Sequence, residues 1–130
     1  MVFVTDNELG LDGGYRFPDF VKFARGADLL IHDAQYLPEE MPVHRGWGHS
    51  TYEEVVRLAL EAEVKNLLLT HHDPSRQDNG VREIVTRAQK QAAASGSPLP
   101  IDAAREGAVV YVGDRVTMSS RRLPATRRKS

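Results

Sequence analysis

Residues 66–74 read NLLLTHHDP and set the interpretation of the whole chain. Three leucines and a threonine form a short apolar run typical of a buried strand. Two histidines, an aspartate and a proline follow directly. In α/β folds the carboxyl ends of the strands deliver side chains to ligand sites. The stretch therefore predicts a strand at residues 66–70 that ends at a site built from imidazoles and a carboxylate.

Three other short runs end at comparable side chains. VFVT at residues 2–5 precedes Asp6, DLLIH at 28–32 precedes Asp33, and RGWG at 45–48 precedes His49. Because such runs in an α/β layer end at a shared rim, we expect these groups to lie near His71 and His72.

The remaining elements alternate with these runs. Pro18 and Gly26 bracket a short helix at residues 19–25, and STYE at residues 50–53 resembles a capping box that opens a second helix. Apolar residues at helical spacing between positions 81 and 92 predict a third helix, and residues 108–112 and 115–118 predict a terminal hairpin. This alternation predicts an α/β layer with an unusually long loop at residues 34–48.

Composition limits the type of site. The chain has 130 residues, no cysteine and a net charge of -1. A metal ion would therefore be held by nitrogen and oxygen ligands, without thiolates or disulfides. Neither a membrane-spanning run nor a signal peptide is recognisable, so we expect a cytoplasmic protein with no membrane partner.

Charge divides the chain into two parts. We expect a folded domain at residues 1–118 and a basic flexible tail at residues 119–130, which holds five of the 17 Lys and Arg residues and no acid. A solvated terminus is the simpler interpretation of the tail, so we do not expect a nucleic-acid partner.

The histidines and carboxylates have competing interpretations. His49 suits a proton donor that Asp33 orients, but His49 can equally cap the following helix while Asp33 begins a turn. Asp6 can bind a metal or cap its own turn. Adjacent residues that leave a strand point to opposite sides, so only one of His71 and His72 is expected to bind an ion. We expect Trp47 to pack on the core.

Taken together, VFVTDNE, ADLLIHDAQY, GWGHST, LLLTHHDP and AAREGAVV resemble, in that order, the C-terminal half of metallo-β-lactamase-fold hydrolases, in particular the ribonuclease Z-like and phosphodiesterase-like branches. The resemblance covers about residues 2–112. It implies the C-terminal half of an αββα sandwich, with one mixed sheet and outer helices. It also implies hydrolysis of phosphodiester or related ester bonds by a dinuclear, metal-activated water.

The resemblance assigns a role to each candidate. Asp6 matches the carboxylate that bridges two divalent ions, expected to be zinc, and His71 matches the last histidine ligand. His49 matches the proton-donating histidine, and Asp33 stands where the branch has glutamate. His72 and Asp73 match residues that surround and orient the metal ligands.

The family supplies its other ligands from an H-x-H-x-D-H motif, and no H-x-H occurs in these 130 residues. We therefore expect a chain that is inactive alone and binds two ions only when an N-terminal half is supplied. Its partners would be that half or a second copy at an exposed sheet face, with a small-molecule or nucleotide-type ester as substrate. Whether it is an enzyme stays open: the alternatives are a non-catalytic interaction module of the same fold and a nucleic-acid binder that uses the tail.

Overall fold

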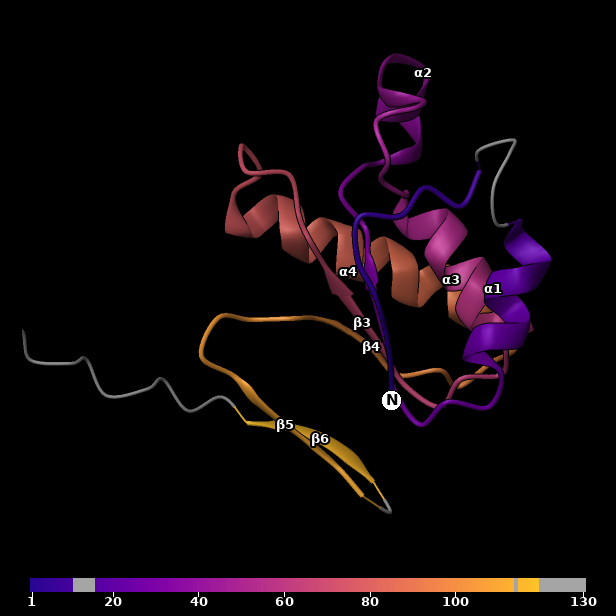
Figure 1. Cartoon of the computed structure of the whole chain (residues 1–130). Helices are drawn as coiled ribbons and strands as arrows, with labels where there is room; N and C mark the ends of the chain where they lie inside the picture. The colour runs from indigo at the N-terminus through magenta and orange to yellow at the C-terminus, as the bar shows by residue number, and fades with distance from the viewer. Residues whose placement is uncertain (11–15, 114, 120–130) are drawn as a thin grey trace, which may run out of the picture.

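The computed structural model describes residues 1–10, 16–113 and 115–119 and contains two sheets (Figure 1). A four-stranded sheet has the order β1-β2-β3-β4, and every neighbouring pair is parallel. A two-stranded antiparallel sheet pairs β5 with β6. The strands are β1 (Val2–Val4), β2 (Leu30–Asp33), β3 (Leu67–Thr70), β4 (Ile101–Ala103), β5 (Val109–Val112) and β6 (Val116–Ser119).

Helices connect the parallel strands. They are α1 (Phe17–Ala24), α3 (Tyr52–Glu61) and α4 (Asp78–Ala94), with a short 3₁₀ helix η1 (Pro38–Glu40) and one turn of helix α2 (Met41–His44) between β2 and α3. The strand order equals the chain order, so right-handed crossovers place α1, α3 and α4 on one face of the sheet. Figure 1 shows these three helices packed side by side.

The core lies between this helical layer and the sheet. One face of α3 (Val55, Val56 and Ala59) is fully buried against Leu30 and Leu69 of the two central strands. Thr51 begins α3: its hydroxyl accepts a hydrogen bond from the Glu54 N–H, and the Glu54 carboxylate accepts one from the Thr51 N–H. This reciprocal cap places the N-cap residue of α3 two positions after His49.

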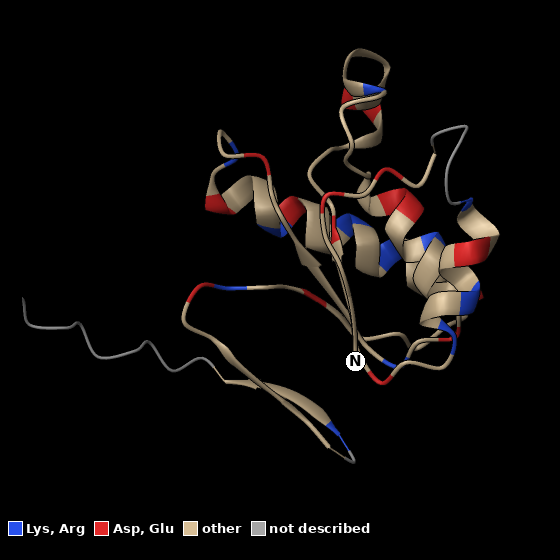
Figure 2. Cartoon of the chain, in the orientation of Figure 1, with Lys and Arg blue, Asp and Glu red and all other residues tan. Residues whose placement is uncertain are grey.

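None of the described helices covers the opposite face of the sheet. Phe3, Ile31, Leu68 and Asp102 occupy it in register, and Phe3 is 58% exposed. Val110 and Met118 of the hairpin share a hollow of about 250 Å³ with Leu68, so the hairpin lies beside part of this face. β5 (VVYV) and β6 (VTMS) contain no charged residue, and Figure 2 shows blue on the hairpin only next to its turn. All-parallel sheets are normally covered on both faces, so this face is suited to contact a second layer.

The predicted α/β class with outer helices is confirmed, but in place of one mixed sheet the described residues form a parallel four-stranded sheet and a separate antiparallel hairpin. The capping box lies one residue later than predicted, at Thr51 and Glu54. The long loop contains η1 and α2, and β4 was not predicted.

The predicted basic tail lies, apart from Ser119, outside the described residues. Among the described helices, none has the length and apolarity needed to cross a bilayer.

Candidate metal centre

Four predicted site residues meet at the carboxyl edge of the sheet. Asp6 follows β1, Asp33 ends β2, His71 follows β3, and His49 precedes α3. One donor atom from each lies within 4.8 Å of the others. Segments separated by up to 65 positions of sequence therefore supply one cluster, as parallel strand ends do.

The backbone at two of these residues is strained. Asp6 has φ 48° and His71 has φ 53°, in the left-handed region that non-glycine residues seldom occupy. Each such residue costs on the order of 1 kcal/mol, and such conformations concentrate at functional sites. The side chains of these two residues meet, with His71 Nε2 3.0 Å from Asp6 Oδ1.

Asp33 is the buried centre of the cluster, with 0% of its surface exposed. Its Oδ1 accepts hydrogen bonds from the backbone N–H groups of Gln35 (3.3 Å) and Ser50 (3.2 Å). Its Oδ2 lies 2.5 Å from His49 Nδ1 and 3.6 Å from His71 Nδ1. A carboxylate out of water needs such partners, and here they fix both oxygens.

The two imidazoles lie over each other, with ring centroids 4.5 Å apart and planes inclined by 17°. His49 donates its Nδ1–H to Asp33, which leaves Nε2 as the free nitrogen of that ring. The Asp6 side chain is 66% exposed and the His49 side chain 17%, so the cluster opens to solvent at Asp6.

These donors suit a divalent metal ion. Imidazole nitrogen and carboxylate oxygen are ordinary ligands of zinc and related ions. Two donors bound to one tetrahedral ion at about 2.0–2.1 Å lie roughly 3.3 Å apart, close to the His71–Asp6 separation of 3.0 Å. His49 Nδ1, in contrast, is already taken by Asp33. The cluster thus divides into a pair of exposed metal-type donors and a buried carboxylate–imidazole pair.

His32 precedes Asp33 but lies outside the cluster. Its Nδ1–H donates to the Asp33 carbonyl at 2.7 Å, and its Nε2 accepts from the Asn7 amide at 3.3 Å. Burial lowers the pKa of His32, against smaller opposing effects of the Asp33 backbone and charge. The neutral ring therefore links the segment after β1 to the end of β2.

His72 and Asp73, predicted to support the metal ligands, make none of their described hydrogen bonds to the cluster. Asp73 accepts from the backbone N–H and the hydroxyl of Ser75, which lowers the pKa of Asp73. Burial, then the nearby Arg76 charge, lower the pKa of His72. Neither His72 ring nitrogen has a hydrogen bond of ordinary geometry within the described part of the chain. The supporting role of both residues stays a prediction.

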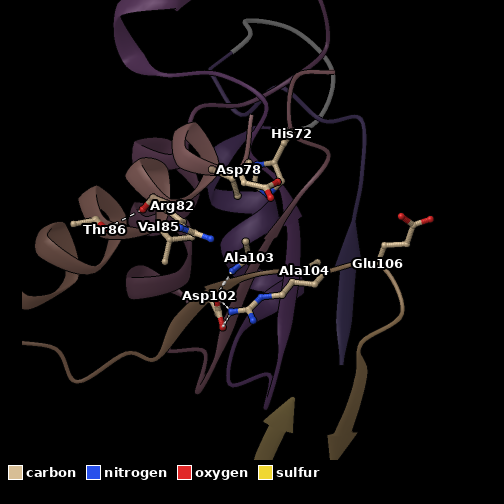
Figure 3. A pocket seen from close by; sticks show the side chains of 11 residues that line it. His72, Asp78, Arg82, Val85, Thr86, Asp102, Ala103, Ala104 and Glu106 are labelled. Carbon is tan, nitrogen blue, oxygen red and sulfur yellow. Dashed lines mark hydrogen bonds and ion pairs between the residues drawn. The ribbon is translucent and has the colours of Figure 1, made fainter. Parts of the chain in front are cut away.

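A hollow of about 910 Å³ is lined by His72 and by none of the four cluster residues (Figure 3). Residues of α4, of β4 and of the segment after β4 line it, and Asp102, labelled at the lower side in Figure 3, forms an ion pair with Arg105.

Sequence reasoning missed Glu8 and misplaced Trp47. Glu8 is buried and accepts hydrogen bonds from the N–H groups of Gly46 and Gly48 at 3.0 Å. Trp47, predicted to pack on the core, is 64% exposed. The signal that was available is the Gly-Trp-Gly sequence, whose two glycines allow the backbone to present the ring outward.

Comparisons with known proteins identify relatives by sequence. The chain is 36% identical over 74 residues to ribonuclease Z of Brevibacillus brevis, 40% over 73 residues to that of Streptococcus mutans, and 45% over 58 residues to that of Saccharolobus islandicus. These alignments cover 54%, 51% and 45% of this chain but only 23%, 24% and 19% of the relatives. The chain thus spans about a quarter or less of the length of these curated relatives.

A solved structure shares the fold. The metallo-β-lactamase fold protein YhfI from Bacillus subtilis superposes with a TM-score of 0.54 and 26% identity, over 72% of this chain and 35% of YhfI. No family model matches the chain. The predicted resemblance to the metallo-β-lactamase superfamily, and within it to the ribonuclease Z-like branch, is confirmed.

Proposed function

We propose that this chain, which has a metallo-β-lactamase-type fold, forms part of a metal-dependent phosphodiesterase that acts on RNA or on a related nucleotide ester. The single observation that carries the proposal is the convergence of Asp6, Asp33, His49 and His71 within 4.8 Å. Sequence identity of 36–45% to ribonuclease Z supports the bond type. The relatives' name therefore revises the sequence-based expectation that nucleic acid is not a partner.

Asp6 and His71 are the proposed metal ligands. Asp6 would bridge two divalent ions, for which we propose zinc, and His71 Nε2 would bind one of them. When bound, such a pair supplies an activated water and charge stabilisation at phosphorus. Two ions need more donors than these residues offer, so we propose that a segment carrying H-x-H-x-D-H completes the centre and that this chain is inactive without it.

Asp33 and His49 are the proposed proton-transfer pair. Asp33 Oδ2 holds Nδ1–H of His49 and so fixes the tautomer and the plane of the ring. Protonated His49 would then give the Nε2 proton to the leaving oxygen of the ester. Ser50 and Gln35 hold the other oxygen of Asp33, which keeps the pair in one orientation.

Metal uptake on complementation tests the proposal directly. We expect the chain mixed with an H-x-H-x-D-H segment to bind about two zinc ions and to hydrolyse a chromogenic phosphodiester. Asp6→Ala and His71→Ala should each lower zinc content, measured by mass spectrometry after equilibrium dialysis. Asp28→Ala, which removes an exposed carboxylate paired with Lys65, is the control and should leave zinc content unchanged.

A soluble, folded complex that takes up no zinc would contradict the proposed function. Zinc uptake without hydrolysis of any phosphodiester would retain the metal site and reject the reaction.

The uncovered sheet face yields a second prediction. We expect the chain alone to associate through Phe3 and its neighbours, because exposed apolar surface of this kind is normally covered. Phe3→Ser should shift its sedimentation toward monomer and weaken its binding to the complementing segment. Phe23→Ser removes an aromatic ring that is 66% exposed on α1 and should change neither. Equal association of both variants would place the contact elsewhere.

A further inference from the structure

The chain's single tryptophan is presented to solvent beside the proposed site. Trp47 is 64% exposed, although burial of an indole ring usually stabilises a folded protein. It stands two positions before His49, so the two Cα atoms are at most about 7.6 Å apart. Trp47 thus lies on the same short segment as the proposed proton donor.

The backbone around Trp47 is fixed rather than loose. Gly46 and Gly48 each have φ 89°, and both donate their N–H groups to the buried Glu8 carboxylate. Arg45 adds an ion pair with Glu8 at 3.7 Å. A buried acid thus holds the two residues that flank the indole, so the ring has few orientations to lose on binding.

Three successive ring contacts connect the indole of Trp47 to His49 of the cluster. Trp47 meets His44 edge to face, with centroids 4.8 Å apart, and His44 stacks on Tyr36 at 4.4 Å. Tyr36 in turn lies edge to face with His49 at 6.1 Å. The indole itself stays open to solvent, since Trp47 is 64% exposed. A flat group can therefore approach the indole without displacing the chain.

We propose that Trp47 is a stacking platform for a nucleobase that flanks the phosphodiester at the metal centre. This inference rests on the proposed function, since it is the phosphodiester substrate that brings a base to this position. Every base offers a π face, so the contact would favour nucleotide esters over other esters without selecting one base. Arg45, which precedes Trp47 by two positions, is already paired with Glu8 and Glu54, so stacking is the contact that this segment offers a base.

Fluorescence of the single tryptophan gives a direct test that needs no catalysis. A single-stranded oligoadenylate of about six nucleotides should quench Trp47 emission of the wild-type chain. An oligomer of the same length and charge with abasic sites in place of the bases should not. Equal quenching by both oligomers would overturn the proposal, because charge alone would then explain the signal.

Variants provide an independent measurement. Anisotropy of a labelled oligoadenylate should show binding weakened roughly five- to 100-fold in Trp47→Ala and largely restored in Trp47→Phe. Phe23→Ala, an exposed ring on α1, is the matched control. Unchanged affinity in Trp47→Ala would overturn the platform. A blue shift of Trp47 emission that depends on protein concentration alone would also overturn it and would assign the ring to a protein contact.

Zinc uptake at Asp6 and His71, measured on the same preparations, separates the two proposals. Quenching without zinc uptake in the complemented protein overturns the proposed function and retains the platform. Zinc uptake and hydrolysis without quenching overturn the platform alone.

Discussion

Replacing His49 by alanine is expected to lower kcat of the complemented protein by about 10²- to 10⁴-fold, the range typical of a lost general acid. The reason is geometric: Asp33 occupies Nδ1 of His49, so only Nε2 is free to protonate the leaving oxygen. Zinc content should stay at the wild-type level, because Asp6 and His71 carry the proposed metal contacts. The measurements are steady-state kinetics on a nucleotide diester and zinc analysis of the same sample.

The leaving group decides between a proton donor and a metal ligand. A nitrophenolate leaves without a proton, so His49→Ala should lose much less activity on a nitrophenyl diester than on a diester with a ribose leaving group. His49 also lies in the four-residue cluster, with Nδ1 4.0 Å from Asp6 Oδ1. Equal losses on both substrates, together with lower zinc content, would show that His49 binds metal and would reject its role as the acid.

The position of the site followed from the sequence because of where apolar runs stop. LLLT and DLLIH are too short for helices, and each is followed directly by a side chain that can bind a metal ion or take part in proton transfer. Parallel strands bring such ends to one edge, whatever the loops between them do. Asp33 and His71 were therefore placed near each other without any knowledge of the loop conformations.

Contacts that depend on loop geometry were not predictable in the same way. Glu8 reaches Gly46 across 38 positions of sequence, and no periodicity encodes such a contact. The cap of α3 moved from Ser50 to Thr51 because the Ser50 hydroxyl is used elsewhere, donating to the Asn7 carbonyl at 2.6 Å. Local propensity favours either residue as a cap, and the tertiary hydrogen bond decides between them.

β4 shows a third limit of sequence reasoning. Ile101–Ala103 is only three residues long and contains an aspartate, so it lacks both a strand-like run and a clear alternation. It forms because β3 offers an open edge: the Leu67 N–H donates to the Pro100 carbonyl and the Ala104 N–H to that of Leu69. Hydrogen bonds to β3 thus stabilise β4, although its own residues give little preference for a strand.

Replacing Asp33 by alanine is expected to give the largest loss of stability of any site variant, about 3–5 kcal/mol in the free energy of unfolding. The carboxylate is fully buried, and its removal leaves the N–H groups of Gln35 and Ser50 and the Nδ1–H of His49 without their acceptor. A domain of this size has only about 5–15 kcal/mol in total. Urea unfolding followed by circular dichroism measures the change, and Asp28→Ala, an exposed ion pair, should stay within about 0.5 kcal/mol of wild type.

Asp33→Asn separates the structural from the catalytic role of the same side chain. Its amide oxygen can still accept from Gln35 and Ser50, so the stability loss should be smaller than for alanine. Its amide nitrogen would face His49 Nδ1, and two donors cannot share that contact, so His49 must give up the Nδ1–H tautomer. We therefore expect a folded Asp33→Asn protein whose kcat falls as far as that of His49→Ala, with no further loss in the double variant. Wild-type kcat in folded Asp33→Asn would mean that Asp33 only connects β2 to the start of α3. The catalytic role of His49 would then not depend on the negative charge of Asp33.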